Sequence, residues 1–262
     1  HPRVQSIQSV TLGTQDSAQI TYLPLRPTSY VNPLMANKDF RTAIIKALDK
    51  ESYVNFVMEG KATVAHSVIG PKVLGYTQAA EAACIGYDPE GAKALIEANN
   101  WQDEPILFLV PTSPTYTPMG EFFQSNLKAV GFNNVKMEMI DWAAWLTESK
   151  LENRFDITLA AWSNVTRDGT ELLEPNWESK ASARNKINNA VFDQLVMDSK
   201  TTADVEKRMV ALENANILLM EEALVAPLVN GEYHFAYNSR DYANIDLTTD
   251  GSFYIKEFSP AQ

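Results

Sequence analysis

The segment "AAWSNVTRDG" (residues 160–169) holds several side chains that are suited to contacting a small molecule. It combines an indole, neutral hydrogen-bonding groups, one cation and one anion. It follows the apolar alternating run "FDITL" and ends in Asp-Gly, a dipeptide typical of turns. By residue chemistry alone, a ligand mouth and an ordinary strand end with a solvated turn are equally good interpretations. The side chains concerned are Trp162, Ser163, Asn164, Arg167 and Asp168.

A second polar loop, "PTSPTYTP" (111–118), follows another predicted strand and carries neutral hydrogen-bonding side chains. The aromatic segment "DWAAW" (141–145) follows a third. Ligands of open parallel sheets bind at the carboxyl ends of the strands. Two converging polar loops with a tryptophan are the usual composition of a small-molecule pocket. The candidate ligand-binding residues are therefore Trp162, Ser163, Asn164, Arg167, Asp168, Tyr116 and Thr115.

The sequence lacks the residues that metal binding, nucleophilic catalysis and phosphate binding need. The three histidines form no i, i+4 pair and have no cysteine partner, whereas a structural zinc ion takes about four N or S ligands. We therefore expect no metal and no cofactor. No G-x-S-x-G or phosphate-binding glycine motif is present, and the adjacent His66 and Ser67 do not make a triad by adjacency. Cys84 stands among acidic residues, which disfavour a reactive thiolate. We expect a protein that is not an enzyme.

Composition narrows the class further. The 262 residues carry a formal net charge of -11, which disfavours nucleic-acid binding. One cysteine excludes an internal disulfide and leaves the compartment open. No apolar run approaches the ~20 residues that span a bilayer. The chain opens "HPRVQSIQSV", without an initiator Met or a visible signal peptide, which suggests a processed or excised chain.

The order of predicted elements indicates an α/β fold. Residues 1–36 read as irregular with short β-like pieces, and Asn37, Asp49, Asp88 and Asp141 are good helix starts. Strands are predicted at 106–110, 135–140 and 155–162, with a helix at 118–130. The alternation predicts a mostly parallel sheet flanked by helices. Later segments predict helices at 189–199 and 203–223, followed by the strands "APLV" and "EYHFAYN".

Several segments together resemble one protein family. They are "NPLMANKDFRTAIIKALDKESYV", "GYDPEGAKALIEANNW", "NLKAVGFNNVKMEMID", "RFDITLAAW" and "NAVFDQLVMDS…EKRMVALENANILLMEEALVAPL". In this order, from about Pro33 to about Leu228, the chain resembles the C-terminal half of the dipeptide/oligopeptide-binding proteins of bacterial ABC importers. Asn100-Trp101 stands where the family pattern has Gly-Trp.

The resemblance implies one lobe of a two-lobed periplasmic-binding-protein-like fold, with the ligand enclosed between the lobes. Residues 26–228 would form the C-terminal α/β lobe, residues 1–25 would cross from the first lobe and residues 229–262 would cross back. The implied partners are a peptide or other small solute and a membrane ABC permease, and the fragment itself is expected to be monomeric. The implied location is extracytoplasmic, either free in a periplasm or anchored as a cell-surface lipoprotein.

One position departs from the family. In peptide-binding members, an Asp three residues past the strand Trp meets the ligand's ammonium group; here that position is Val165. Either Asp168 takes this role from a shifted loop, or the ligand is not held by an amine here and Arg167 meets an anion. The alternatives left open are a non-peptide solute such as a sugar, opine or metal chelate, a sensor or adhesion module, and, less favoured, a hydrolase.

Overall fold

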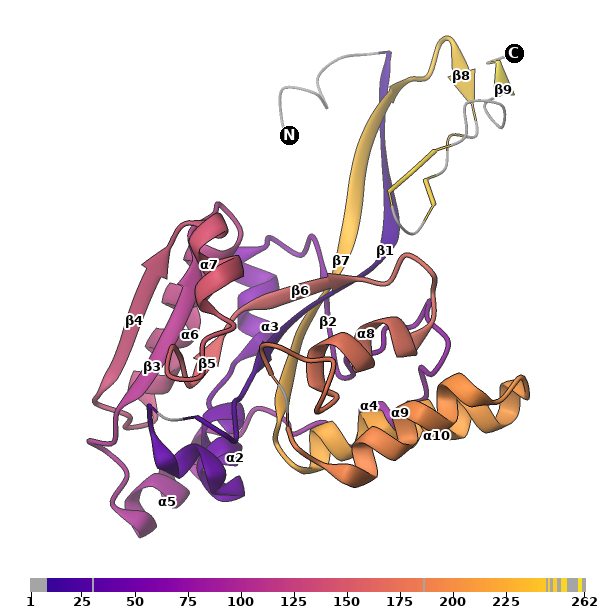
Figure 1. The fold of residues 1–262 in the computed structure, drawn as a ribbon. Coiled ribbons are helices and arrows are strands. Elements are labelled where there is room, and N and C mark those ends of the chain that lie inside the picture. Colours follow the sequence, from indigo (N-terminus) through magenta and orange to yellow (C-terminus); the bar gives the residue numbers. More distant parts are fainter. Residues whose placement is uncertain are drawn as a thin grey trace.

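A long antiparallel ribbon runs through the molecule. The computed structural model describes residues 9–29, 31–185, 187–243, 245, 247–248, 251–253 and 259–260. Strands β1 (Val10–Pro24) and β7 (Val225–Asn238) pair from end to end, with irregularities in register between Asp16 and Ile20 and between Thr21 and Tyr22, and one end of this ribbon extends away from the rest of the chain (Figure 1). The prediction of an irregular start is therefore wrong for residues 10–24, which form one continuous strand. Likewise, the two predicted C-terminal strands are a single strand, β7.

The parallel sheet is made of the three strands that the sequence predicted. β3 (Ile106–Pro111) pairs in parallel with β4 (Val135–Ile140) on one side and with β5 (Ile157–Thr158) on the other. The first connection contains α6 (Tyr116–Ala129) and the second contains α7 (Trp142–Glu148). The predicted α/β class, with a parallel sheet and flanking helices, is thus confirmed.

The run "FDITLAAW" is not one strand, as predicted, but two. After β5, the chain continues as β6 (Ala160–Ser163), which pairs antiparallel with β1. The second sheet has the order β2 (Thr63–Val64), β7, β1, β6. The run is divided because its first half forms backbone hydrogen bonds with β3 and its second half with β1. The loop 164–168 therefore follows a strand of the antiparallel sheet, not of the parallel one.

Local capping explains the predicted helix starts, which are confirmed. Asn37, Asp49, Asp88 and Asp141 each accept N–H groups from the first turn of the next helix. The corresponding helices are α2 (Lys38–Lys46), α3 (Lys50–Ser52) with the π-helical turn η2 (Tyr53–Val57), α5 (Pro89–Asn99) and α7.

Helix α8 (Gly169–Trp177) was not predicted, and it begins at the Asp-Gly pair that we interpreted as a turn. The two later helices are confirmed as α9 (Ala190–Thr201) and α10 (Val205–Glu221). The short elements are η1 (Pro33–Ala36), α4 (Gln78–Ala82), β8 (Tyr242–Ala243) and β9 (Ser259–Pro260).

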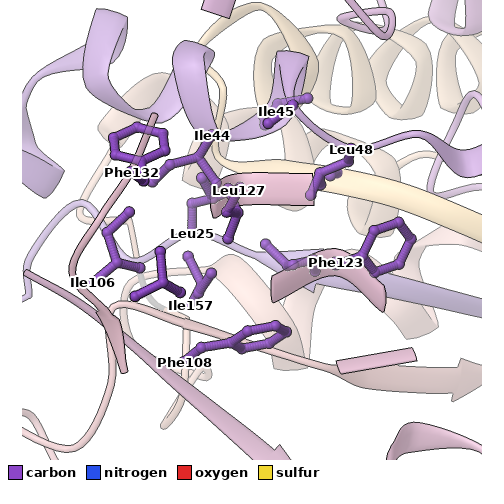
Figure 2. Close-up of a cluster of buried hydrophobic side chains, with 14 of the residues drawn as sticks. Leu25, Ile44, Ile45, Leu48, Ile106, Phe108, Phe123, Leu127, Phe132 and Ile157 are labelled. Atoms are coloured by element: carbon purple, nitrogen blue, oxygen red, sulfur yellow. The ribbon is translucent and has the colours of Figure 1, made fainter. Parts of the chain in front are cut away.

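Two hydrophobic clusters form the interior. The first joins the parallel sheet to α2, α5 and α6; in Figure 2, Phe108 and Ile157 of the sheet lie near Phe123 and Leu127 of α6. The second includes Ile20 and Tyr22 of β1 and side chains from α8, α9 and α10. The inner half of the ribbon therefore belongs to the core of this chain. In the described part of the chain, no helix has both the length and the apolar character to span a bilayer.

Candidate ligand-binding site

Strand β6 directs its candidate residues to two opposite faces of the antiparallel sheet. Ser163 lies opposite Gln19 of β1, and its Oγ accepts a hydrogen bond from Gln19 Nε2 at 3.1 Å. Trp162 lies opposite Ile20, which belongs to the second cluster. Because side chains alternate along a strand, Trp162 and the following Asn164 share the other face. The backbone N–H of Asn164 extends the ladder by donating to the carbonyl of Ala18 at 3.2 Å.

The polar atoms of Trp162 and Asn164 are buried without protein partners. Asn164 is 1% exposed, and neither its Oδ1 nor its Nδ2 has a hydrogen-bond partner among the described residues. The indole Nε1 of Trp162 is in the same situation. An unpaired buried polar group costs about 1–3 kcal/mol, so these groups favour a polar partner from outside the chain. The groups concerned are the indole N–H of Trp162 and the amide NH2 and oxygen of Asn164.

Val165 and Arg167 form the exposed turn that follows. The N–H of Arg167 donates to the carbonyl of Asn164 at 3.2 Å, and Arg167 has a φ of 58°. Val165 is 59% exposed and has no polar group to offer. The side chain of Arg167 is exposed and makes no ion pair with any described residue. The position expected to hold an ammonium group therefore has no carboxylate.

Asp168 is engaged inside the protein. Its Oδ1 accepts the N–H of Thr170 at 3.0 Å, which caps α8, and its Oδ2 pairs with Arg208 of α10. Burial raises the pKa of Asp168, but the bonds from Thr170 and Arg208 outweigh it and hold the pKa below its usual value. The neighbouring backbone is also held, since Leu74 exchanges hydrogen bonds with Arg167 and Gly169.

Thr115 lies beside the face of the antiparallel sheet that carries Gln19, which is opposite to the face of Trp162. The N–H groups of Thr115 and Tyr116 donate to Ser113 Oγ at 3.3 and 2.9 Å, which shapes the loop before α6. Thr115 lines a hollow of about 450 Å³ together with Gln19, whose amide bonds Ser163. Other residues lining the hollow are Thr21, Tyr53, Glu232 and His234.

Tyr116 belongs to a group that we call the aromatic wall: Tyr116, Trp142 and Trp145. Tyr116 stacks on Trp142 with 6.1 Å between ring centroids, and Trp142 stacks on Trp145 at 5.0 Å. Burial raises the pKa of Tyr116 to about 12, and the positive charge of Arg184 partly offsets this. Trp142 is 45% exposed, so the wall is open to solvent at one end. The structure thus brings the loops after β3 and β4 together.

Sequence reasoning missed Arg184. Its guanidinium carbon lies 4.1 Å from the centroid of Trp145, and its Nε donates to Ser149 Oγ at 2.8 Å. Burial lowers the pKa of Arg184, while Tyr22 and Tyr116 act in the opposite direction. No signal in the sequence pointed to this residue, because "SARN" lies between predicted elements and matches no motif.

The geometry does not favour the enzyme alternative at Ser67. Its Oγ donates to the carbonyl of Ile69 at 2.9 Å and accepts a bond from Asn216 Nδ2 at 2.6 Å, and no bond to His66 is present. Cys84 Sγ accepts from the buried Lys50 at 3.6 Å. Within the described residues, no group of three or more His, Cys, Asp or Glu side chains could hold a metal ion.

The sequence matches a known family of proteins and individual members of known function. Residues 2–184 match the family described as bacterial extracellular solute-binding proteins, family 5 Middle. A probable di/tripeptide-binding protein 5 of Pseudomonas aeruginosa is 26% identical over 230 residues, which cover 82% of this chain and 42% of that protein. The chain therefore spans less than half the length of this relative.

Two solved structures share the fold. The dipeptide-binding protein of Pseudoalteromonas sp. SM9913, in complex with Met-Leu, superposes with a TM-score of 0.80 at 20% identity over 99% of this chain and 52% of that one. NikA of Staphylococcus aureus, in complex with Ni(L-His)2, gives 0.79 at 18% identity over 99% and 55%. At these identities the likeness concerns the fold and not the ligand.

Proposed function

Because the chain belongs to the family 5 bacterial extracellular solute-binding proteins, we propose that it forms one wall of a cleft that binds a small solute for an ABC importer. A peptide or a related compound is the proposed solute. Lobe closure around it would produce the form that docks on a membrane permease. The opposite wall would come from the part of the protein that corresponds to the unmatched half of its relatives.

The observation that carries this proposal is the pair of unsatisfied side chains on β6. Trp162 and Asn164 direct buried, unpartnered polar atoms to one face, close to where the strand ends. An indole and an amide are typical of the few polar groups that orient a ligand in a mostly apolar pocket. We assign solute contact to these two residues and to Tyr116 of the aromatic wall.

The other predicted site residues receive different roles in this proposal. Asp168 holds the turn through its cap and its ion pair, and Arg167 shapes that turn. Thr115 and Ser163 line or support the hollow on the far face of the sheet. With Val165 at the anchor position, we propose that no carboxylate of this wall holds an ammonium group.

The terminal segments support a two-lobed arrangement. The outer half of the ribbon alternates between exposed and partly buried residues, and Leu12 is 41% exposed. We propose that this outer half connects to the other lobe, as the segments 1–25 and 229–262 were predicted to do. The inner half, with Tyr22 fully buried, stays with this lobe. Residues 1–8 lie outside the described part.

Solute identity is best tested on the complete protein. Calorimetric titration with di-, tri- and oligopeptides should give a saturable heat for at least one of them. Asn164→Ala should weaken that binding about tenfold, the worth of one buried hydrogen bond. Asn216→Ala is the matched control, since Asn216 is equally buried with an unpartnered Oδ1 but lies on α10. Binding of sugars, opines or metal chelates without any peptide would refute the peptide assignment.

The cellular role follows from the same proposal. The family is extracellular, and we propose that the complete protein is either free in a periplasm or held at the cell surface as a lipoprotein. We also propose that it acts as a monomer. Cells that lack the protein should lose uptake of the solute that calorimetry identifies, and a transport assay measures this loss. Unchanged uptake together with intact binding would favour a sensor or adhesion module.

A further inference from the structure

We propose that Lys50 and Cys84 form a peroxide-sensitive site, in which oxidation of the thiol joins the two side chains through a sulfur–nitrogen bond. The substrate class is hydroperoxides, of which hydrogen peroxide is the simplest. The two reacting atoms, Lys50 Nζ and Cys84 Sγ, lie 3.6 Å apart, although 34 positions separate the residues in the chain. Neither residue is among the proposed solute contacts, so this reactivity is separate from solute binding.

Lys50 is a buried amine without a carboxylate partner among the described residues. It is 6% exposed, and its Nζ donates to the carbonyl of Ala65 at 2.9 Å. A protonated lysine has three N–H donors, and in the described part of the chain the sulfur of Cys84 is the one further group that Nζ contacts as a hydrogen-bond partner. Lysines are almost never fully buried unless they are paired. The burial of Lys50 therefore gives its contact with the sulfur particular weight.

Cys84 presents its sulfur to this amine. The thiol is half-buried, so a small oxidant has access to it, and its S–H donates to the carbonyl of Ile85 at 3.7 Å. Because the S–H is directed to Ile85, a sulfur lone pair is free to accept from Lys50. The deprotonated sulfur is the atom that attacks an oxidant. The pair thus places a second nucleophile, the amine, in contact with the atom that is oxidised.

The acidic residues that flank Cys84 in the sequence are engaged with other groups. Asp88 pairs with Lys46 and caps α5. Burial and then a hydrogen bond with Glu81 raise the pKa of Tyr76, which places the Glu81 carboxylate beside that hydroxyl. The sequence indicated an unreactive cysteine because its neighbours in the chain are acidic, whereas the fold brings an amine to the sulfur.

The backbone on both sides of the contact is held in place. Cys84 follows α4, and its N–H donates to the carbonyl of Glu81 at 3.1 Å. The loop after Cys84 is held at Asp88, whose N–H donates to the carbonyl of Lys46 at 2.9 Å. Lys50 is the first residue of α3. The flexible four-carbon stem of the lysine can therefore bring the amine onto the sulfur without a change in the fold.

The reaction has two steps. The thiolate of Cys84 attacks one oxygen of hydrogen peroxide, the O–O bond breaks, and a sulfenic acid and hydroxide form. The neutral amine of Lys50 then attacks the sulfur, the S–O bond breaks, and the departing hydroxide takes the amine proton and leaves as water. Sulfenic acids condense with a backbone nitrogen in the same way, and an amine is the stronger nucleophile. From thiol and ammonium, one peroxide is reduced to two waters and one proton is released. The product is a sulfenamide, two hydrogens lighter than the thiol and amine.

The test is peptide mapping of the complete protein after treatment with hydrogen peroxide. Trypsin cuts after an unmodified Lys50, so the reduced protein yields residues 47–61 as two fragments. We expect peroxide to yield 47–61 uncut and joined to 73–93, the fragment that contains Cys84, with a mass two hydrogens below their sum. Dithiothreitol should separate the two fragments. Cys84 recovered as a thiol, or as sulfinic or sulfonic acid with Lys50 still cut, would overturn the inference.

Three controls connect the product to the folded pair. Lys46 is the matched lysine, because it lies nearby on α2 but pairs with Asp88, and tandem mass spectrometry should place the link at Lys50 and not at Lys46. Lys50→Arg keeps a cation and removes the amine, so Cys84 should proceed to sulfinic acid without a link. If Lys50→Arg does not fold, treatment of the unaltered protein in concentrated urea serves instead, and there the link should be absent. A link at Lys46, in Lys50→Arg, or in equal yield in urea contradicts the proposed site.

Discussion

Replacing Asp168 separates a structural role from a ligand-anchoring role. Asn caps helices about as well as Asp, so Asp168→Asn should keep the bond to Thr170 N and place an uncharged amide NH2 where the carboxylate oxygen meets Arg208. Asp168→Ala should lose both the cap and the ion pair. Comparing the two variants therefore isolates the ion pair from the cap.

The expected magnitudes follow from burial. The side chains of Asp168 and Arg208 are 24% and 25% exposed, so their pair lies between a surface pair, worth about 0–1 kcal/mol, and a charge-assisted buried hydrogen bond, worth about 1.5–3 kcal/mol. We expect Asp168→Asn to lower the free energy of unfolding by about 1.5 kcal/mol. The lost cap should bring Asp168→Ala to about 2.5 kcal/mol.

The assay is urea unfolding at several pH values. The pKa of Asp168 is lowered in the folded state, so the carboxylate's contribution is present above its unfolded pKa of about 3.9 and is lost as pH falls through the folded pKa. The stability difference between the unaltered protein and Asp168→Asn should therefore be constant above about pH 5 and shrink below about pH 4.

Two results would refute this reasoning. One is a difference of less than about 0.3 kcal/mol at pH 7, which would show that the pair with Arg208 contributes nothing. The other is a large loss of solute affinity in the complete Asp168→Asn protein with unchanged stability. That outcome would restore Asp168 as the ammonium anchor.

Three further predictions concern packing and binding. Gly75→Ala should lower the free energy of unfolding by about 2–4 kcal/mol in a denaturant titration, because Gly75 has a φ of +101° and a Cβ there would lie 2.7 Å from Leu212 Cβ. The control is Gly60→Ala, which should cost only about 1 kcal/mol because Gly60, at φ +71°, has open space around it. Tyr22→Phe should cost about 1–2 kcal/mol in the same assay, because it leaves Asn176 Oδ1 without the donor it has at 2.7 Å; an unchanged stability would mean that water replaces the hydroxyl. The 262-residue chain alone should bind the solute at least 100-fold more weakly than the complete protein in calorimetry, since it supplies one wall, and equal affinities would contradict the two-walled cleft.

Features with local causes could be predicted from the sequence. Caps such as Asp88 and Asp141 act on N–H groups within three residues, and β4 was predicted with its observed bounds because its residues alternate. Features that depend on distant partners could not. The split of "FDITLAAW" arises because β1, more than a hundred residues away, offers a better ladder to residues 160–163 than the parallel sheet does.

The candidate site shows the same division. Trp162 and Asn164 were recognised from residue type and position after a strand, although their contact with solute stays a prediction. Asp168 was taken as a ligand group because its partner Arg208 is forty positions away in the chain, where no pattern relates the two. α8 was missed because Asp-Gly is typical of turns and Pro175 lies inside the helix.

The most direct test of the central claim is an NMR titration of the complete protein with the solute, following the indole Nε1–H resonances. Trp162 Nε1 is buried and unpartnered in this chain, so solute binding should move its resonance in proportion to saturation. Trp101 belongs to the first hydrophobic cluster and serves as the internal control. We predict a large shift for Trp162 and none for Trp101. Saturable binding that leaves the Trp162 resonance unchanged would contradict the account.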